Sequence, residues 1–89
     1  MQEMKFRVTA KDGIHARPAA QIVETAQKFS SAVEFITAEA RVNAKSIMEI
    51  MMLSAVYGTE LVLQISGDDE QTALGEMTTL LLQNIAEAA

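Results

Sequence analysis

The sequence has no cysteine and no tryptophan, and it contains one proline and one histidine in 89 residues. The absence of cysteine excludes disulfide bonds and thiolate metal sites, and a single histidine leaves few ligands for a transition metal. We therefore expect a protein that binds no metal ion and needs no cofactor of its own.

Long apolar segments are also missing. The first seven residues mix charged and apolar side chains instead of forming a signal-peptide core, and no stretch reaches the about 20 apolar residues of a membrane helix. We expect a cytoplasmic protein without direct membrane insertion. Basic residues are few as well: 7 against 12 acidic ones give a net charge of −5, which argues against nucleic-acid binding and favours protein partners.

Residues 1–89 are expected to form one domain. A chain of this length buries about 60–65% of its unfolded surface, which is enough for one modest core and not for two. Apolar and polar residues alternate at residues 4–9 and 60–66, and these stretches are predicted to be strands with one buried face. Residues 32–37 and 40–43 are predicted to be two further strands joined by a tight turn.

Apolar residues at helical spacing predict three helices. The first follows His15 directly and buries one side, made of Ala19, Ile22, Val23, Ala26 and Phe29. The second is short and ends near Leu53, and Ser46 with Glu49 matches a capping box at its start. The third is predicted to begin after Asp68, and its apolar residues are Leu74, Met77, Leu80, Leu81 and Ile85.

The predicted element order is βαββαβα. The strands that follow the first helix are too close together in the sequence for the crossover connections of a parallel sheet. We therefore predict an α+β fold in which a four-stranded antiparallel sheet carries three helices on one face.

Residues 13–20 read Gly-Ile-His-Ala-Arg-Pro-Ala-Ala and place His15 just before the first helix. A helix N-terminus has about four backbone N–H groups without internal partners, and together with the helix dipole they attract anions. Pro18 fits the first turn because its φ is already helical and it has no N–H to satisfy. The lone pair of a neutral imidazole at His15 could attack phosphorus, while Arg17 can neutralise phosphoryl oxygens.

These residues, followed by Asn-Ala-Lys-Ser-Ile-Met at 43–48, resemble the motifs of the HPr family, the phosphocarriers of the phosphoenolpyruvate-dependent sugar phosphotransferase system. The resemblance runs from Met4 to Ile85. It implies an open-faced β-sandwich with its strands in the spatial order 1-4-2-3.

The resemblance also implies a phosphoryl-transfer intermediate rather than a turnover enzyme. Phosphorylated enzyme I would place a phosphoryl group on Nδ1 of His15, and the carrier would then pass it to EIIA components of sugar permeases. His15 would be the nucleophile and Arg17 the charge stabiliser, with the phosphate lying against Ala16, Arg17 and Pro18.

A second site implied by the resemblance is Ser46, which an HPr kinase/phosphorylase phosphorylates in many members so that a transcription regulator can be recruited. This chain departs from the family pattern at Glu49, where glycine is common. A carboxylate at the same helix terminus repels phosphoserine, so we expect weaker phosphorylation of Ser46, or weaker recognition of the phosphorylated product, than in a Glu49→Gly variant.

The resemblance further implies a partner-binding face beside His15. Its expected contact residues are Ala20, Gln21, Glu24, Ile47, Met48 and Met51. Flexible methionine side chains can adapt to several partner surfaces. We expect a monomer, with a strand-swapped dimer as the alternative.

Three other interpretations of the chain remain open. The first is that the same chemistry serves a nitrogen-type regulatory phosphorelay. This interpretation is kept because the chain has Met51-Met52-Leu53 in place of the commoner Met-Ser-Leu. A co-effector of transcription that acts only through phosphorylated Ser46 is a second, although the presence of His15 argues against it. A small α+β ligand-binding domain without phosphate chemistry is the third, because fold alone does not determine function.

Overall fold

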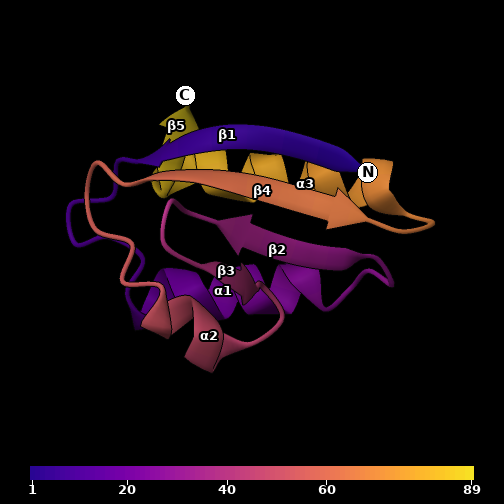
Figure 1. Ribbon diagram of the computed structural model, residues 1–89, viewed down its shortest axis with the longest axis horizontal. Coiled ribbons are helices and arrows are strands. Elements are labelled where there is room, and N and C mark those ends of the chain that lie inside the picture. The colour runs from indigo at the N-terminus through magenta and orange to yellow at the C-terminus, as the bar shows by residue number, and fades with distance from the viewer.

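The computed structural model describes residues 1–89. Its elements are β1 (Gln2–Val8), α1 (Ala16–Ala26), β2 (Ala32–Ile36), β3 (Arg41–Asn43), α2 (Ile47–Met52), β4 (Glu60–Ser66), α3 (Glu70–Asn84) and β5 (Ala86–Ala88). The strands form one antiparallel sheet in the order β3-β2-β4-β1-β5 (Figure 1). None of the helices has the length and apolarity required to cross a membrane.

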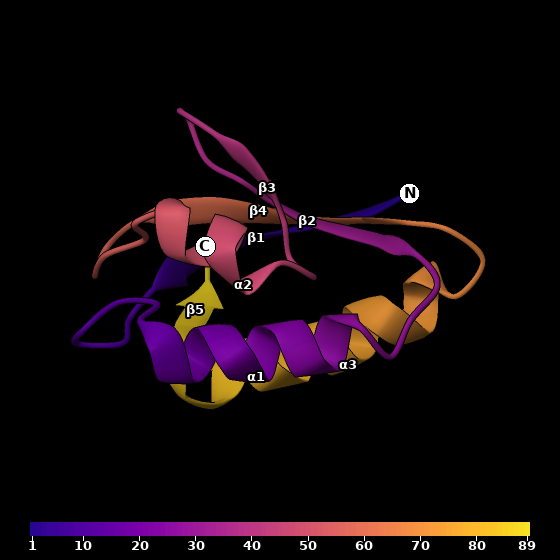
Figure 2. The ribbon, with the colours of Figure 1, turned by 90° about the horizontal axis from the view of Figure 1, so that it is seen from below.

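The helices lie against one side of the sheet and leave the other side open. Helices α1 and α3 run side by side beneath the strands, and α2 packs against α1 and the edge strand β3 (Figure 2). The α+β class, the three helices and the order of the first four strands are therefore as predicted.

The strand β5 was not predicted. It pairs with β1 in antiparallel register, with Ala86 opposite Val8 and Ala88 opposite Phe6. The segment consists mostly of alanine and has none of the β-branched or aromatic residues that mark strands, so no local pattern reveals it. It becomes a strand because α3 ends beside the free edge of β1, where the Ile85 carbonyl accepts hydrogen bonds from the Thr9 and Ala10 N–H groups at 2.9 and 3.1 Å.

The core lies between the sheet and the helices. Alternate residues of the strands point into it, as the period of two predicts; in β4 these are Leu61, Leu63 and Ile65. Ile22 of α1 and Met77 of α3 meet them from the helical layer and are fully buried. Each large apolar side chain buried in this way contributes about 1.5–3 kcal/mol.

Two predicted helix boundaries are wrong. Helix α1 ends at Ala26, and Phe29 is buried in the turn that follows the helix, not in the helix itself. Helix α3 begins after Asp69 instead of Asp68. In both cases the boundary depends on a contact with a distant part of the chain. The local spacing of apolar and acidic residues does not distinguish a residue that makes such a contact from one that belongs to the helix.

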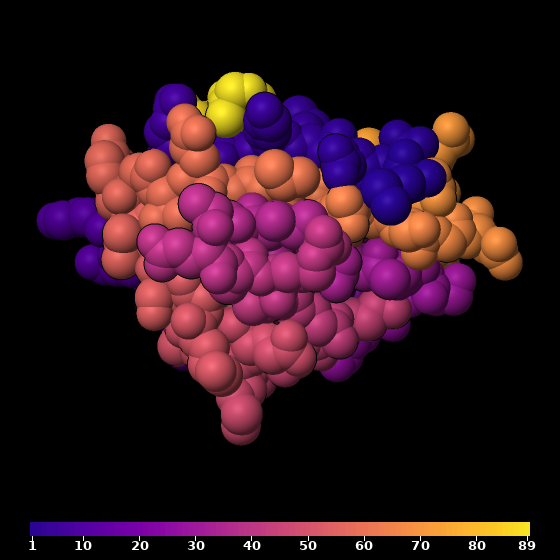
Figure 3. All heavy atoms as spheres, in the orientation of Figure 1, coloured from indigo at the N-terminus to yellow at the C-terminus, as the bar shows by residue number.

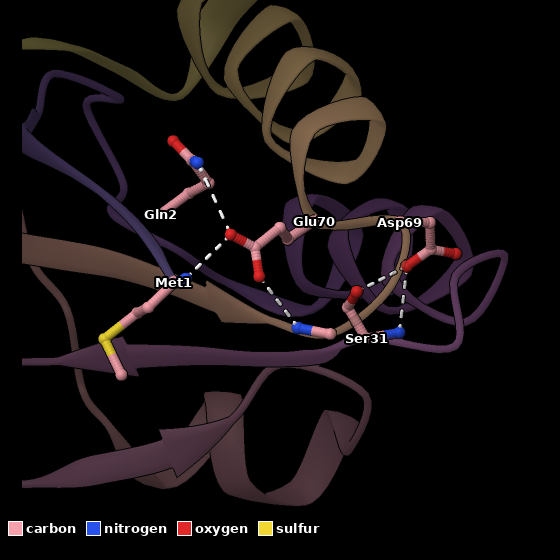
Figure 4. Close-up of polar contacts among 6 residues, drawn as sticks. Met1, Gln2, Ser31, Asp69 and Glu70 are labelled. Carbon is pink, nitrogen blue, oxygen red and sulfur yellow. Dashed lines mark hydrogen bonds and ion pairs between the residues drawn. The ribbon is translucent and has the colours of Figure 1, made fainter.

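Asp69 joins the start of α3 to the segment between α1 and β2 (Figure 4). Its carboxylate accepts hydrogen bonds from the Ser30 and Ser31 N–H groups, both at 3.0 Å, and from the buried Ser31 hydroxyl. The hydroxyl bond is the largest cause that lowers the pKa of Asp69 below its ordinary value of 3.8. The neighbouring Glu70 accepts from the Met1 ammonium group at 2.7 Å, and this bond is the main reason that the pKa of Glu70 is lowered.

The tight turn between β2 and β3 is confirmed, although it has no glycine or asparagine. The Thr37 hydroxyl oxygen accepts from the N–H groups of Glu39 and Ala40 at 3.3 and 3.2 Å, and the Thr37 N–H donates to the Ala40 carbonyl at 2.8 Å. A threonine hydroxyl thus closes the turn through local side-chain to backbone bonds.

Candidate functional site

His15 is the N-cap of α1, the position at which the sequence places it. Its backbone is extended, with φ −86° and ψ −172°, and its carbonyl accepts from the Ala19 N–H at 3.0 Å, which begins the helix. The imidazole is exposed and makes no capping hydrogen bond. The ring is therefore free to meet another molecule.

The loop before His15 is held in place by a close backbone contact. Gly13 has φ +71°, and a Cβ at this position would lie 2.5 Å from the Ala55 carbonyl oxygen and 2.9 Å from Cα of Val56. The Ile14 N–H donates to that same Ala55 carbonyl at 2.8 Å, and the Ile14 side chain is buried. The segment after α2 therefore positions His15, which the sequence signals only through the presence of a glycine.

The N-terminus of α1 is electropositive and has no compensating charge. The Ala16 and Arg17 N–H groups have no hydrogen-bond partner within the chain, and Pro18 has no N–H. No acidic residue lies in the first turn. Arg17 is exposed and makes no ion pair, whereas Arg7 and Arg41 are both paired with glutamates. An anion at this helix end would therefore find unoccupied donors.

An open hollow of ≈ 340 Å³ lies beside the ring. Its lining residues are Ala10, His15, Arg17, Pro18, Gln21, Asn84 and Ile85. The structure thus places His15, Arg17 and Pro18 around one hollow and adds the end of α3. Asn84 and Ile85 are about 70 residues away along the chain and belong to no motif, so the sequence offers no signal for them.

Ser46 is the N-cap of α2, and its hydroxyl accepts from the Glu49 N–H at 3.2 Å. The other half of the predicted capping box is wrong, because the Glu49 carboxylate accepts from the Asn43 N–H at 3.0 Å and not from the Ser46 N–H. The Ser46 N–H donates to the Asn43 carbonyl instead, at 3.1 Å. Asn43 ends the edge strand β3, so its N–H is available to the carboxylate, which is thereby fixed beside the loop that leads to Ser46.

The loop before Ser46 is attached to the far end of α1. The Lys45 ammonium group donates to the Phe29 carbonyl at 2.7 Å, and the Gln27 amide donates to the Lys45 carbonyl at 3.3 Å. Helix α1 has 11 residues and is about 16 Å long. His15 and Ser46 are therefore separated by roughly one length of α1, and a phosphate on Ser46 would not share the anion site of His15.

The predicted partner-binding face is a mixed surface of α1 and α2, which pack against each other. Gln21 and Glu24 are exposed on α1, and Ala20 is half-buried. The large apolar side chains exposed on α2 and the loop after it are Ile47, Met48, Met51, Met52, Val56 and Tyr57. Met52, Val56 and Tyr57 are not among the predicted contact residues, and they extend the exposed apolar surface into the loop that holds the segment before His15.

The structure brings no three metal-ligating side chains of the histidine, cysteine or carboxylate type together. The His15 site itself brings together one imidazole, the Arg17 guanidinium group and the backbone donors of a helix end. Such a set suits a tetrahedral anion such as a phosphoryl group.

Comparisons with known proteins agree with this geometry. Residues 2–83 match the family model described as the HPr component phosphorylation site of the phosphotransferase system. The chain is 44% identical over 80 residues to the phosphocarrier protein HPr of Xylella fastidiosa, with 90% of each chain covered. The structure of HPr from Thermoanaerobacter tengcongensis superposes with a TM-score of 0.89 at 42% identity, covering 94% of each chain.

A further similar structure is that of Crh, the Bacillus subtilis catabolite repression protein, which forms a swapped dimer. It has a TM-score of 0.74 and 40% identity, and it covers 86% of this chain and 88% of Crh. Because the family match spans residues 2–83 and the fold agrees with solved members, the chain belongs to the HPr phosphocarrier family of the phosphotransferase system.

Proposed function

We propose that this protein accepts a phosphoryl group on His15 from phosphorylated enzyme I and passes it to EIIA components of sugar permeases. The observation that carries the proposal is the exposed imidazole at the N-cap of α1, next to an exposed and unpaired Arg17. The family of the chain supports the same assignment.

In the proposed transfer the Nδ1 lone pair of His15 attacks phosphorus, an N–P bond forms, and the bond from phosphorus to the donor breaks. The Arg17 guanidinium and the free N–H groups of Ala16 and Arg17 would hold the phosphoryl oxygens while charge accumulates on them. The second transfer is the reverse reaction with EIIA as the acceptor. The carrier's own contribution is position and charge, which is most of what phosphoryl transfer requires of a protein.

The direct test uses the protein with phosphoenolpyruvate and enzyme I. We expect one phosphoryl group per chain, labile in acid and stable in base, since phosphohistidine behaves in this way and phosphoserine in the opposite way. His15→Ala should abolish the adduct, and Ser46→Ala should leave it unchanged. An adduct that survives in His15→Ala would refute the proposal, because the chain has no second histidine.

Ser46 is proposed as a regulatory phosphorylation site for an ATP-dependent HPr kinase/phosphorylase, with a transcription regulator as the downstream partner. What supports this is its position at an N-cap, half-buried and within the family motif. The fixed Glu49 carboxylate would oppose a dianionic phosphate there, so the regulatory branch is proposed to be weaker than the relay.

The carrier is proposed to act in the cytoplasm as a monomer. Within one chain, β1 is paired on both sides, with β4 and with β5, so it needs no strand from a second copy. Size-exclusion chromatography with light scattering should give a mass near 9.7 kDa. A mass of twice that value would favour the swapped arrangement seen in Crh.

A further inference from the structure

Helix α2 has an outward face made largely of methionine. It holds three of the six methionines of the chain, and Met48, Met51 and Met52 are 71%, 43% and 73% exposed, whereas Met77 in α3 is fully buried. Residues three and four apart share one face of a helix. The three thioethers therefore lie together, and the only fully buried residue of α2 is Ile50.

We infer that this methionine cluster, Met48, Met51 and Met52, is a site of reversible oxidation by peroxide, and that oxidation slows phosphoryl exchange at His15. In each oxidation a sulfur lone pair attacks one peroxide oxygen. An S–O bond forms, the O–O bond breaks, and the proton of the hydroxyl group transferred to sulfur passes to the departing hydroxide to give water. The sulfur is oxidised by two electrons to the sulfoxide, and the peroxide is reduced.

The structure allows this change without unfolding. Helix α2 is held by Ile50 in the core and by the Ser46 hydroxyl bond to the Glu49 N–H at 3.2 Å, and neither contact involves sulfur. Met77 is shielded from solvent. Oxidation therefore converts an exposed apolar surface into a polar and chiral one while the core keeps its packing.

The consequence for phosphoryl exchange rests on the proposed function. Helix α2 packs against α1, which begins at His15, and the α2 segment projects from the lower edge of the molecule (Figure 3). A partner that approaches His15 along α1 meets this projecting surface. A sulfoxide oxygen buried in the interface without a donor would weaken the complex about tenfold to hundredfold.

The experiment treats the intact protein with increasing hydrogen peroxide and follows each methionine by peptide mass. We expect Met1, Met48 and Met52 to be oxidised first and Met51 next, with Met77 unmodified and the circular dichroism spectrum unchanged. The rate of phosphorylation by enzyme I should fall about tenfold or more. Treatment with methionine sulfoxide reductases of both epimer specificities and a dithiol, which supplies the two electrons and is oxidised to the disulfide, should restore it.

The matched control replaces all three residues of the cluster with leucine. Met1, which is 70% exposed, remains in this variant as an internal target, and its oxidation should leave the phosphorylation rate unchanged. The single variant Met48→Leu, expected to lose part of the sensitivity, provides the same test if the triple variant folds poorly.

Oxidation of Met77 in parallel with the cluster would overturn the assignment of a surface site, and so would an unchanged rate after full oxidation of the cluster. An untreated protein that accepts no phosphoryl group from enzyme I would overturn the proposed function and the consequence derived from it. The mass measurements need no enzyme I, so they test the oxidation site separately.

Discussion

The close approach at Gly13 leads to a graded prediction for three glycine to alanine substitutions. Gly13 and Gly58 both have positive φ, +71° and +89°, so alanine costs about 1–2 kcal/mol at either position from backbone conformation alone. At Gly58 no atom lies within 4 Å of the added Cβ, and no further cost arises. At Gly13 the Cβ would lie 2.5 Å from the Ala55 carbonyl oxygen, and a backbone atom cannot rotate out of the way.

Relief of the contact at Gly13 requires the loop to move, and the hydrogen bond from the Ile14 N–H to the Ala55 carbonyl, 2.8 Å long, is then lost. Overpacking and loss of this bond bring the expected total for Gly13→Ala to about 3–5 kcal/mol. Gly75 lies inside α3 with open space around it, so Gly75→Ala is expected to stabilise the protein by about 0.5–1 kcal/mol.

Urea unfolding at 25 °C, followed by far-UV circular dichroism, measures the free energy of unfolding of wild type and of the three variants. We expect the same denaturant m-value for all four proteins. The expected order of stability is Gly75→Ala, wild type, Gly58→Ala and then Gly13→Ala. Equal losses in Gly13→Ala and Gly58→Ala would refute the argument from close approach and leave only backbone conformation. Folded Gly13→Ala should also accept phosphate from enzyme I more slowly, because the loop that positions His15 has moved.

Three further predictions concern charge. Asp69→Asn should lower the free energy of unfolding at pH 7. Because the pKa of Asp69 in the folded protein is below 3.8, the difference in this free energy between the variant and wild type should shrink as the pH falls below that value. A constant difference down to pH 2 would contradict the hydrogen bond from Ser31 as the cause of the lowered pKa. Glu49→Gln keeps an oxygen that can accept from the Asn43 N–H and removes the negative charge, so HPr kinase should phosphorylate Ser46 severalfold faster than in wild type. Equal rates would show that the charge of the carboxylate has no effect. Arg17→Ala should slow phosphorylation by enzyme I by about a hundredfold in a rapid-quench assay, and Arg17→Lys should restore part of the rate. A decrease of less than threefold in Arg17→Ala would show that this side chain does not stabilise the transferring group.

The residues around His15 could be predicted from the sequence because the signals are local. A proline in the first turn, apolar residues at helical spacing and a preceding glycine all lie within one short segment, and each has a direct effect on the backbone. Strand β4 was predicted with its observed bounds for the same reason, since its buried and exposed residues alternate throughout.

The parts that could not be predicted depend on contacts between distant segments. The residues Ala86–Ala88 form a strand only because α3 delivers them to the edge of β1, and Asn84 lines the hollow beside His15 for the same reason. Asp68 and Asp69 are equivalent as helix caps by residue type. What distinguishes them is that the second meets the N–H groups of Ser30 and Ser31, far back along the chain. Local propensity carries no information on such partners.

The distribution of ion pairs in this acidic protein leaves the guanidinium group of Arg17 free. The chain has 12 acidic residues and 7 basic ones, and two of its three arginines, Arg7 and Arg41, are held in ion pairs. Five carboxylates are paired with cations elsewhere: Glu60 and Glu87 with Arg7, Glu34 with Arg41, Glu76 with Lys28, and Glu70 with the Met1 ammonium group. The first three of these pairs join residues of the five strands, and no ion pair of the chain includes Arg17. Because the first turn of α1 has no carboxylate of its own either, an incoming phosphoryl group competes with no side chain of the carrier for Arg17.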